Sequence, residues 1–282
     1  MITVLNPGIY CTIQDLGRIG FAHIGVPISG AMDLHSASIG NQLLNNKKSA
    51  AVLEIPFGGC KLQFETVVTI CLTGADFNPT IDGELIALNS VFKVAKGAIL
   101  SFGSRKYGVR TYLCVLGGFD AETVLKSSSY YKGVTARSYL QKGDTLCVGF
   151  NNPIKQKSHA KIKVDVQHFS TNKIRVTKGP EFELLSKNQQ NALLKGVFTV
   201  SKDNNRVGYQ LEESLENELK PILTSGVLPG TVQLTPSGKL IVLMRDCQVT
   251  GGYPRILQLL DNATSKLGQK IAGDEVQFWL EE

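Results

Sequence analysis

The stretch with the most side chains that could act in catalysis or ligand binding lies near the C-terminus, where an apolar run ends in a charged pair and a polar loop. Leu243-Met244 leads into Arg245-Asp246, and the loop that follows carries an amide, a hydroxyl, two glycines and a phenol. Polar side chains on a loop after a strand are typical of a ligand site rather than of a core. We predict Asp246 as a general base or an orienting carboxylate. Gln248 and Thr250 are predicted catalytic residues that hydrogen-bond a polar planar substrate, and Gly251, Gly252 and Tyr253 are predicted to bind it.

Cys247 lies within the same stretch and is the alternative nucleophile, although no histidine lies near it in the sequence.

A second group of such residues near the N-terminus combines glycines, carboxylates and a guanidinium. Glycine lets the backbone approach a ligand closely, and an arginine can bind a carboxylate through two parallel hydrogen bonds. A helix capped by Ser29 would add free N–H groups for an anion. The predicted substrate-binding residues are Gln14, Asp15, Arg18, Ser29, Gly30 and Asp33, together with Arg206 from a turn-rich stretch farther along. The alternative is an Asp15–Arg18 pair that only ties the loop together.

Standard site motifs are absent from the sequence. It has no phosphate-binding G-x-x-x-x-G-K-[ST], no H-E-x-x-H, no G-x-S-x-G and no paired Cys/His spacing. We therefore predict no metal site. Glu54 lies inside the apolar run Val52–Ile55 and needs either a buried partner or a ligand. The pair Gly117-Gly118 indicates a close approach of backbone after a strand.

The elements that must position these loops are mostly strands. The strand-like runs are rich in Val, Ile, Leu, Phe and Thr and are bounded by Gly, Pro, Asn or Asp. Because strands and helices do not alternate regularly, we predict a mainly β, mostly antiparallel architecture of barrels or sandwiches. Turn residues between Leu234 and Leu240 predict a hairpin. The predicted strands are Val67–Leu72, Ile99–Phe102, Thr111–Leu116, Thr145–Val148, Lys173–Val176, Phe198–Val200, Thr231–Leu234, Leu240–Met244 and Glu275–Leu280.

Helical patterns are few. Ser29 is the predicted cap of a helix from Ala31 to about Leu44. A second helix is predicted to begin at Ser186, which has capping-box spacing to Gln189, and to end at Gly196; a third runs from Asp261 to Gly268.

Two features bear on how the chain divides into domains. A glycine turn that begins a strand recurs at Lys96-Gly97-Ala98, Lys142-Gly143-Asp144 and Ala272-Gly273-Asp274, which suggests that the first and last thirds of the chain close in similar ways, although any β protein reuses such turns. The lysine-rich stretch Asn151–Asn172 is the predicted linker. The predicted domains are an N-terminal one over residues 1–160, with a helical segment near 30–45, and a C-terminal one over 173–282, the placement of the first 60 residues staying open.

Composition excludes several classes of protein. The 282 residues are 43% apolar and 19% charged, which suits a globular chain with a sizeable core. The net charge of +6 is spread along the sequence and does not indicate a nucleic-acid binder. Six cysteines without C-x-x-C indicate buried free thiols in a reducing compartment. With no signal-like start and no long apolar run, we expect a cytoplasmic protein that does not bind membranes.

Five separated motifs, in order along nearly the whole chain, resemble the biotin-dependent carboxyltransferase / allophanate hydrolase subunit 2 family, and most nearly its free-standing 5-oxoprolinase C subunits. The resemblance implies two cyclophilin-like β-barrel domains with a few short helices. The motifs are Gln14-Asp15-x-Gly17-Arg18, Gly25-x-Pro27-x-Ser29-Gly30-Ala31-Met32-Asp33, Leu72-Thr73-Gly74-Ala75, Arg110-x-Tyr112-Leu113 with Gly117-Gly118, and Gln248-x-Thr250-Gly251-Gly252-Tyr253-Pro254.

The resemblance also implies that this chain is one part of an enzyme. The implied partners are the 5-oxoprolinase B component, an allophanate hydrolase subunit 1-type protein, and the 5-oxoprolinase A component, a lactam-utilisation-type protein. Such sets hydrolyse 5-oxo-L-proline to L-glutamate and cleave ATP to ADP and phosphate. The ATP site is expected on a partner or at an interface. Biotin is not carried by this chain, because its methionines are followed by Ile2, Asp33 and Arg245 rather than by lysine.

Two other functions remain open on the sequence alone. One is a biotin-dependent carboxyltransferase or urea amidolyase-type subunit, which would need a separate biotinyl protein. The other is a non-enzymatic antagonist that binds an inhibitor of a sensor kinase. The chain departs from the family pattern at Leu125-Lys126-Ser127-Ser128-Ser129-Tyr130, where Leu-Gly-Ser-Arg-Ser-Thr is common, and at Cys247, where arginine is common. Roles of those arginines in relatives therefore do not carry over to this chain.

Overall fold

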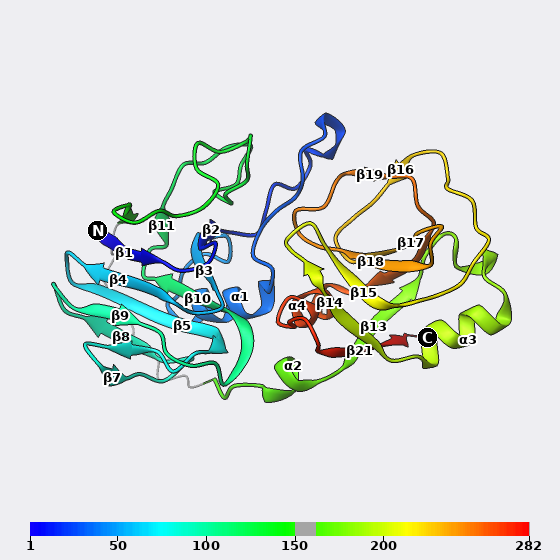
Figure 1. Ribbon diagram of the computed structural model, residues 1–282. Coiled ribbons are helices and arrows are strands. Elements are labelled where there is room, and N and C mark those ends of the chain that lie inside the picture. Colours follow the sequence, from blue (N-terminus) through cyan, green and yellow to red (C-terminus); the bar gives the residue numbers. More distant parts are fainter. Residues whose placement is uncertain (150–161, 282) are drawn as a thin grey trace. The chain divides into compact units, whose positions relative to one another are not determined.

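The computed structural model describes residues 1–149 and 162–281 (Figure 1). The chain forms two compact units: unit 1 comprises residues 1–18 and 29–169, and unit 2 comprises residues 19–28 and 170–282. Of the predicted linker, residues 150–161 lie outside the described residues. In its later part, Val166–Ser170 form helix α2 with His168 and Phe169 buried, and the chain passes from unit 1 to unit 2 between Phe169 and Ser170.

Unit 1 consists of two sheets around one core. The larger has the strand order β11-β12-β1-β4-β9-β6-β7 and the smaller the order β2-β3-β10-β5-β8. Their bounds are β1 (Ile2–Pro7), β2 (Thr12–Gln14), β3 (Val52–Pro56), β4 (Cys60–Phe64), β5 (Val68–Asp76), β6 (Thr80–Ile81), β7 (Glu84–Leu85), β8 (Val91–Val94), β9 (Ile99–Ser101), β10 (Tyr107–Val115), β11 (Phe119–Asp120) and β12 (Thr145–Val148).

Alternation along β5 and β10 gives the smaller sheet two buried faces. Leu72 and Leu113 face the core that the two sheets share. Cys71, Tyr112 and Cys114 point to the opposite face. That face packs against helix α1 (Leu34–Leu43), which runs beside β5 and β10. Packing on the smaller sheet therefore holds α1 in place. The N-terminus of α1 directly follows the predicted substrate-binding residues Ser29, Gly30 and Asp33.

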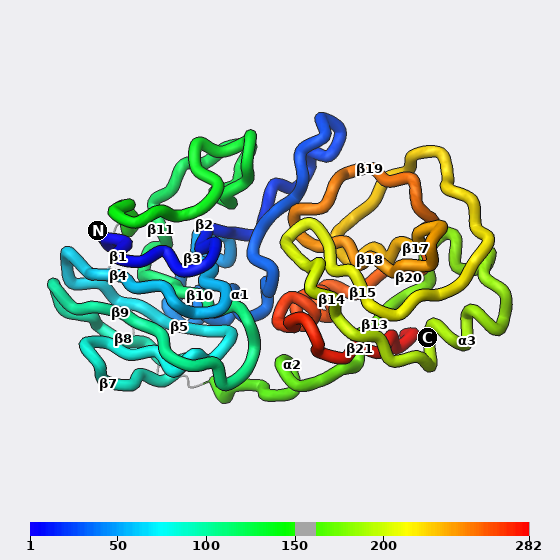
Figure 2. Tube along the Cα trace, viewed as in Figure 1, coloured from blue at the N-terminus to red at the C-terminus, as the bar shows by residue number. Residues whose placement is uncertain are grey.

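Unit 2 is built around a closed barrel of order β13-β20-β17-β18-β15-β14-β21. Figure 2 shows β21 beside β13, the pair that closes the barrel in parallel. The elements are β13 (Lys173–Lys178), α3 (Lys187–Lys195), β14 (Phe198–Asn204), β15 (Gly208–Ser214), β16 (Ser225–Gly226), β17 (Thr231–Leu234), β18 (Lys239–Leu243), β19 (Thr250–Gly251), β20 (Arg255–Leu259), α4 (Asp261–Leu267) and β21 (Glu275–Leu280), with the short 3-10 helices η1 (Ala22–Ile24) and η2 (Phe182–Leu184).

The mainly β prediction is confirmed, and each predicted strand overlaps an observed one. The predicted hairpin is the β17–β18 pair. Helix α3 begins with the full capping box of Ser186 and Gln189, and α4 covers the third predicted helix. Within the described residues, no helix is both long and apolar enough to cross a membrane.

The predicted cap of the first helix was wrong. The side chain of Asp33, not that of Ser29, accepts the hydrogen bond from Ser36 N that caps α1. Ser29 instead adopts a left-handed backbone conformation with φ of 58°. The chain between these two residues runs alongside another loop, so the helix starts later than its sequence pattern indicates.

Candidate functional site

Residues 14–18 and 29–33, called the paired loops below, lie side by side in unit 1. The Ala31 N–H donates to the Asp15 carbonyl at 3.0 Å. Gly30 has φ of +91°, and a Cβ there would lie 3.0 Å from the backbone of the first loop. Only glycine fits this close approach, as the sequence motif requires.

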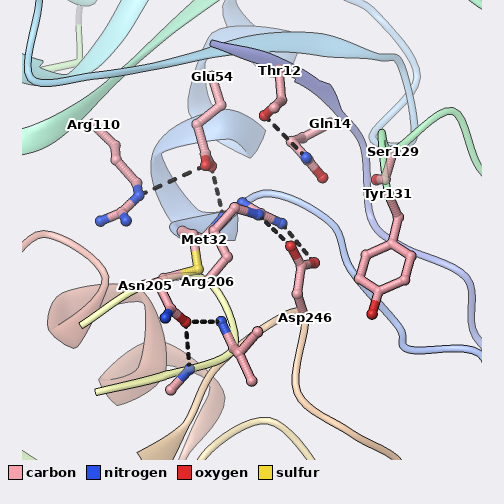
Figure 3. A network of polar contacts seen from close by, with 12 residues as sticks. Thr12, Gln14, Met32, Glu54, Arg110, Ser129, Tyr131, Asn205, Arg206 and Asp246 are labelled. Atoms are coloured by element: carbon pink, nitrogen blue, oxygen red, sulfur yellow. Dashed lines mark hydrogen bonds and ion pairs between the residues drawn. The ribbon is translucent and has the colours of Figure 1, made fainter. Parts of the chain in front are cut away.

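Gln14 and Ser29 present buried polar atoms along the paired loops. The Gln14 Nε2 donates to Thr12 Oγ1 at 3.0 Å (Figure 3), which fixes the amide. The opposite amide atom, Oε1, and the Ser29 Oγ are both buried and have no hydrogen-bond partner among the described residues. Such atoms cost free energy unless something satisfies them, which makes both candidates for holding a ligand.

The Asp15 carboxylate fastens the first loop to the segment Ser127–Ser129. It accepts from Ser127 Oγ at 2.6 Å, from Ser128 N at 2.7 Å and from Ser129 Oγ at 2.7 Å. The guanidinium of Arg18 is fully buried and donates to the Ser129 carbonyl. The first loop is therefore held in place, as the alternative interpretation of Asp15 and Arg18 predicted. The two side chains do so by binding the segment Ser127–Ser129 and not by pairing with each other.

Beneath the second loop, Glu54 is the centre of a buried network (Figure 3). One of its oxygens accepts from Met32 N at 2.8 Å and from Tyr112 Oη at 2.9 Å; the other lies 3.7 Å from Arg110 Nε. Tyr112 Oη in turn accepts from Asp33 N at 2.8 Å. Burial, and then the charges of Glu54 and Asp33, raise the pKa of Tyr112 well above its usual value. The buried partner expected for Glu54 is thus found, and it holds the second loop in place.

Asp33 forms a buried ion pair that the sequence did not reveal. Its Oδ2 lies 2.9 Å from His168 Nε2 and accepts from Ser36 Oγ at 2.6 Å, while its Oδ1 accepts from Ser36 N at 3.0 Å. Burial alone would raise the pKa of this carboxyl, but the hydrogen bond and charge of His168 and the Ser36 bonds outweigh it and lower the pKa. His168 was missed because it lies in a lysine-rich stretch; the cue was the polar Asp165 before an apolar Val166 and Phe169.

In unit 2, Asp246 and Arg206 form a bidentate ion pair (Figure 3). Arg206 Nε donates to Oδ2 at 2.7 Å and Nη2 to Oδ1 at 3.1 Å, and both side chains are 8% exposed. Asn205 shapes the turn between β14 and β15 that carries Arg206, because its Oδ1 accepts from Val207 N and Gly208 N. With both oxygens bound, the carboxylate suits the orienting role rather than that of a general base.

Cys247 follows in the same stretch and is buried. Burial, and then the charge of Asp246, raise the pKa of its thiol to about 12. A thiol with so high a pKa is a poor nucleophile near neutral pH, which argues against the nucleophile alternative.

The loop after Cys247 presents the remaining predicted residues. Gln248, Thr250 and Tyr253 are exposed. Strand β19, which contains Thr250, pairs with β16. A Cβ on Gly251 would lie 2.5 Å from Gln233 Nε2, so this glycine lets the loop lie on the barrel. Gly252 anchors the loop through its carbonyl, which accepts from Ile222 N at 2.9 Å.

Each unit thus gathers its own share of the predicted residues. Unit 1 brings together Gln14, Asp15, Arg18, Ser29, Gly30 and Asp33 in the paired loops. Unit 2 holds Arg206 with Asp246, and the loop from Gln248 to Tyr253. Within residues 1–149 and 162–281, no group of three or more His, Cys, Asp or Glu side chains is arranged to hold a metal ion.

Known proteins resemble the chain over its whole length. It is 32% identical over 285 aligned residues to the C subunit of 5-oxoprolinase from Escherichia coli K12, an alignment that covers 99% of this chain and 90% of that protein. The crystal structure of TTHA0988 superposes with a TM-score of 0.87 at 29% identity, covering 99% of this chain and 55% of that one. The urea amidolyase of K. lactis superposes with a TM-score of 0.86 at 27% identity, but this chain spans 18% of its length.

A family model supports the same assignment. The model for the carboxyltransferase domain, subdomain A and B, matches residues 24–280, which cover most of each unit. The chain therefore belongs to the carboxyltransferase domain A and B family.

Proposed function

We propose that the chain is one component of an ATP-dependent 5-oxoprolinase complex, which hydrolyses the lactam of 5-oxo-L-proline to L-glutamate while ATP is cleaved to ADP and phosphate. The observation that carries this proposal is the alignment with a 5-oxoprolinase C subunit over 99% of this chain and 90% of that protein. The urea amidolyase relatives are matched over 7% and 8% of their length. A free-standing subunit is therefore the better parallel than a segment of a large multidomain enzyme.

The paired loops suit a lactam. The substrate offers one N–H donor, one carbonyl acceptor and one carboxylate within a compact ring. In our proposal, the buried Gln14 Oε1 accepts from the lactam N–H, and Ser29 Oγ donates to the carbonyl oxygen as negative charge develops there. Asp15 and Arg18 position the first loop, while Glu54 and Tyr112 position the second. Held in this way, neither ligating group needs to reorganise during the reaction.

For unit 2 by itself, we propose that the exposed amide and hydroxyl of Gln248 and Thr250 bind a polar group of a ligand. Asp246 acts in this proposal as a positioning residue through Arg206.

ATP and the partners enter only as proposals. The Lys-Gly turns do not fit a phosphate chain, because the N–H groups of Gly97 and Gly143 already donate to the carbonyls of Phe64 and Val4. We therefore assign no step of ATP cleavage to them and propose that a partner protein, of the 5-oxoprolinase A or B type, contributes the nucleotide site. We further propose that the complex is cytoplasmic.

The test is reconstitution of the chain with partners of the 5-oxoprolinase A and B types. We expect L-glutamate and phosphate to be released in equal amounts when 5-oxo-L-proline and ATP are added. Release of neither product by a complex that has assembled would refute the function. Carboxylation of urea in the presence of a biotinyl carrier would instead favour the carboxyltransferase alternative.

Variants in the reconstituted complex test the site. Gln14→Leu is expected to lower kcat/KM by about a hundredfold, because it removes a hydrogen bond to the substrate and leaves the lactam N–H without an acceptor. Gln42→Leu is the matched control, since Gln42 is exposed on α1. An equal loss in both variants would remove Gln14 from the site, while the function would stand on product release alone.

A further inference from the structure

A cavity of about 370 Å³ lies in unit 1 beside the Asp33–His168 pair and apart from the buried atoms of Gln14 and Ser29. Helix α1, strand β5 and the segment that includes α2 line it. Its volume is enough for a molecule on the order of a dozen non-hydrogen atoms. The polar lining residues include His35, Ser36, Thr73, Asn89, Lys163 and His168.

The orientation of His168 leaves one ring nitrogen for a ligand. Nε2 faces the Asp33 carboxylate, which is an acceptor, so Nε2 carries a proton. In the imidazolium form of this ion pair Nδ1 carries a second proton, which it can donate to an anion. The ring is held in place by His35 and Phe169, whose centroids each lie 5.0 Å away. Among the described residues, Nδ1 has no hydrogen-bond partner. His168 lines the cavity with this nitrogen unengaged, although the side chain is 3% exposed.

The lining of the cavity includes a cation that can bind an anion. Its nearby carboxylates are engaged: Asp33 by His168 and Ser36, and Asp165 by Gln167 N at 3.0 Å, where it caps α2. Lys163, by contrast, forms no ion pair with any described residue. A carboxylate in the cavity would therefore meet the ammonium of Lys163, which pairs with no carboxylate among the described residues, and the Nδ1–H of the His168 imidazolium.

One wall of the cavity selects for a donor on the same ligand. The hydroxyl of Thr73 donates its proton to the Ser36 carbonyl at 2.7 Å. Its oxygen can then only accept, so it favours an N–H or ammonium group. Ile39 and Phe169 supply apolar surface for a short aliphatic stem.

We propose that this cavity binds a small amino carboxylate, with the carboxylate at Lys163 and His168 Nδ1 and the amino group at Thr73 Oγ1. None of the residues that line the cavity belongs to the paired loops, and the proposal does not depend on the reaction that the chain serves. Asp33 contributes by orienting His168 and does not touch the ligand.

The experiment uses the full chain with 15N-labelled histidine, titrated with L-glutamate as the probe, with sodium chloride matching the ionic strength. We expect a saturable shift of the His168 Nδ1 resonance, while the exposed His23 does not move. Glutarate, which has the same carboxylates but no amino group, is expected to bind about tenfold more weakly. A chain without any saturable shift, or one in which His23 shifts alongside His168, would overturn the proposal.

Two variants separate binding from folding. His168→Gln and Lys163→Met are each expected to weaken L-glutamate binding in calorimetry by about tenfold or more. Lys163 is exposed, so its variant should fold even if the buried substitution does not. His23→Gln is the control that should keep wild-type affinity. Retained affinity in Lys163→Met, together with an unchanged preference over glutarate in Thr73→Val, would show that binding occurs elsewhere.

Discussion

Each of the two units buries an ion pair next to predicted site residues, and the two pairs are built differently. In unit 2, Arg206 donates twice to Asp246, so that both carboxylate oxygens face one guanidinium. In unit 1, His168 makes one contact with Asp33, and Ser36 supplies two further donors. The first pair depends wholly on its cation, whereas the second shares its carboxylate between a cation and a helix cap.

This difference assigns different roles to two residues that look alike in sequence. An arginine stays charged at any pH that a protein survives, so the Asp246 pair is a permanent structural link. A histidine has a second ring nitrogen beyond the one that meets the carboxylate. The unit 1 pair can therefore also contact a ligand, while the unit 2 pair fixes the turn between β14 and β15.

The largest expected effect is the loss of the cation in unit 2. Arg206→Met leaves Asp246 buried without a counter-charge, which should cost about 3 to 5 kcal/mol of unfolding free energy. The only tryptophan, Trp279, lies in β21 of the barrel, so its fluorescence during urea unfolding reports on unit 2. The double variant Arg206→Met/Asp246→Leu should recover most of the loss. A double variant no more stable than Arg206→Met would mean that packing, rather than charge, is what the arginine provides.

A smaller loss is expected for the cation in unit 1. His168→Gln should cost about 1 to 3 kcal/mol, because Ser36 N and Oγ still donate to Asp33. Hydrogen exchange of the α1 amides should rise, while the Trp279 transition stays where it is in the wild type. If His168→Gln destabilised as strongly as Arg206→Met, the Ser36 donors would not be sharing the carboxylate as the geometry indicates.

Acid should weaken unit 1 through Asp33. Its pKa in the folded chain lies below the ordinary value of 3.8, so the carboxylate stabilises unit 1 above that pH, and the contribution is lost as the pH falls through the lowered pKa. We expect α1 amides to lose protection on acidification below about pH 4, by roughly 1 kcal/mol, the usual worth of an N-cap. Asp33→Asn should flatten this dependence. The same slope in wild type and Asp33→Asn would assign the acid sensitivity to other groups.

Local patterns predicted more of the molecule than its long-range contacts. Three features could be predicted from the sequence: the strand-like runs, the Ser186 capping box and the need of Glu54 for a partner. Each of them depends only on neighbours in sequence or on burial. The pairing of Arg206 with Asp246 spans 40 positions, and that of Asp33 with His168 spans 135. No local pattern encodes such distances.

The first helix start shows the same limit at closer range. Ser29 and Asp33 are both good capping residues, and they stand four positions apart in the same motif. The choice between them is made by the first loop, whose Asp15 carbonyl binds Ala31 N and keeps residues 29–33 out of the helix. That contact is tertiary, so propensity could not supply it.

The smallest expected effect concerns a feature that the two units share, the glycine turn that begins a strand. Gly97 and Gly143 in unit 1 and Gly273 in unit 2 have φ values of 87°, 88° and 88°, and their N–H groups donate to the carbonyls of Phe64, Val4 and Val200. Added Cβ atoms would meet nothing within 4 Å at any of the three glycines. Replacing each glycine by alanine should therefore lower the free energy of unfolding only by the strain of a left-handed backbone, about 1 kcal/mol. The loss should be similar in both units. Hydrogen exchange of the amides in β9, β12 and β21 measures the loss of stability at each turn separately. A severalfold larger loss at one position would mean that the recurring turn is shared in sequence but not in its energetic role.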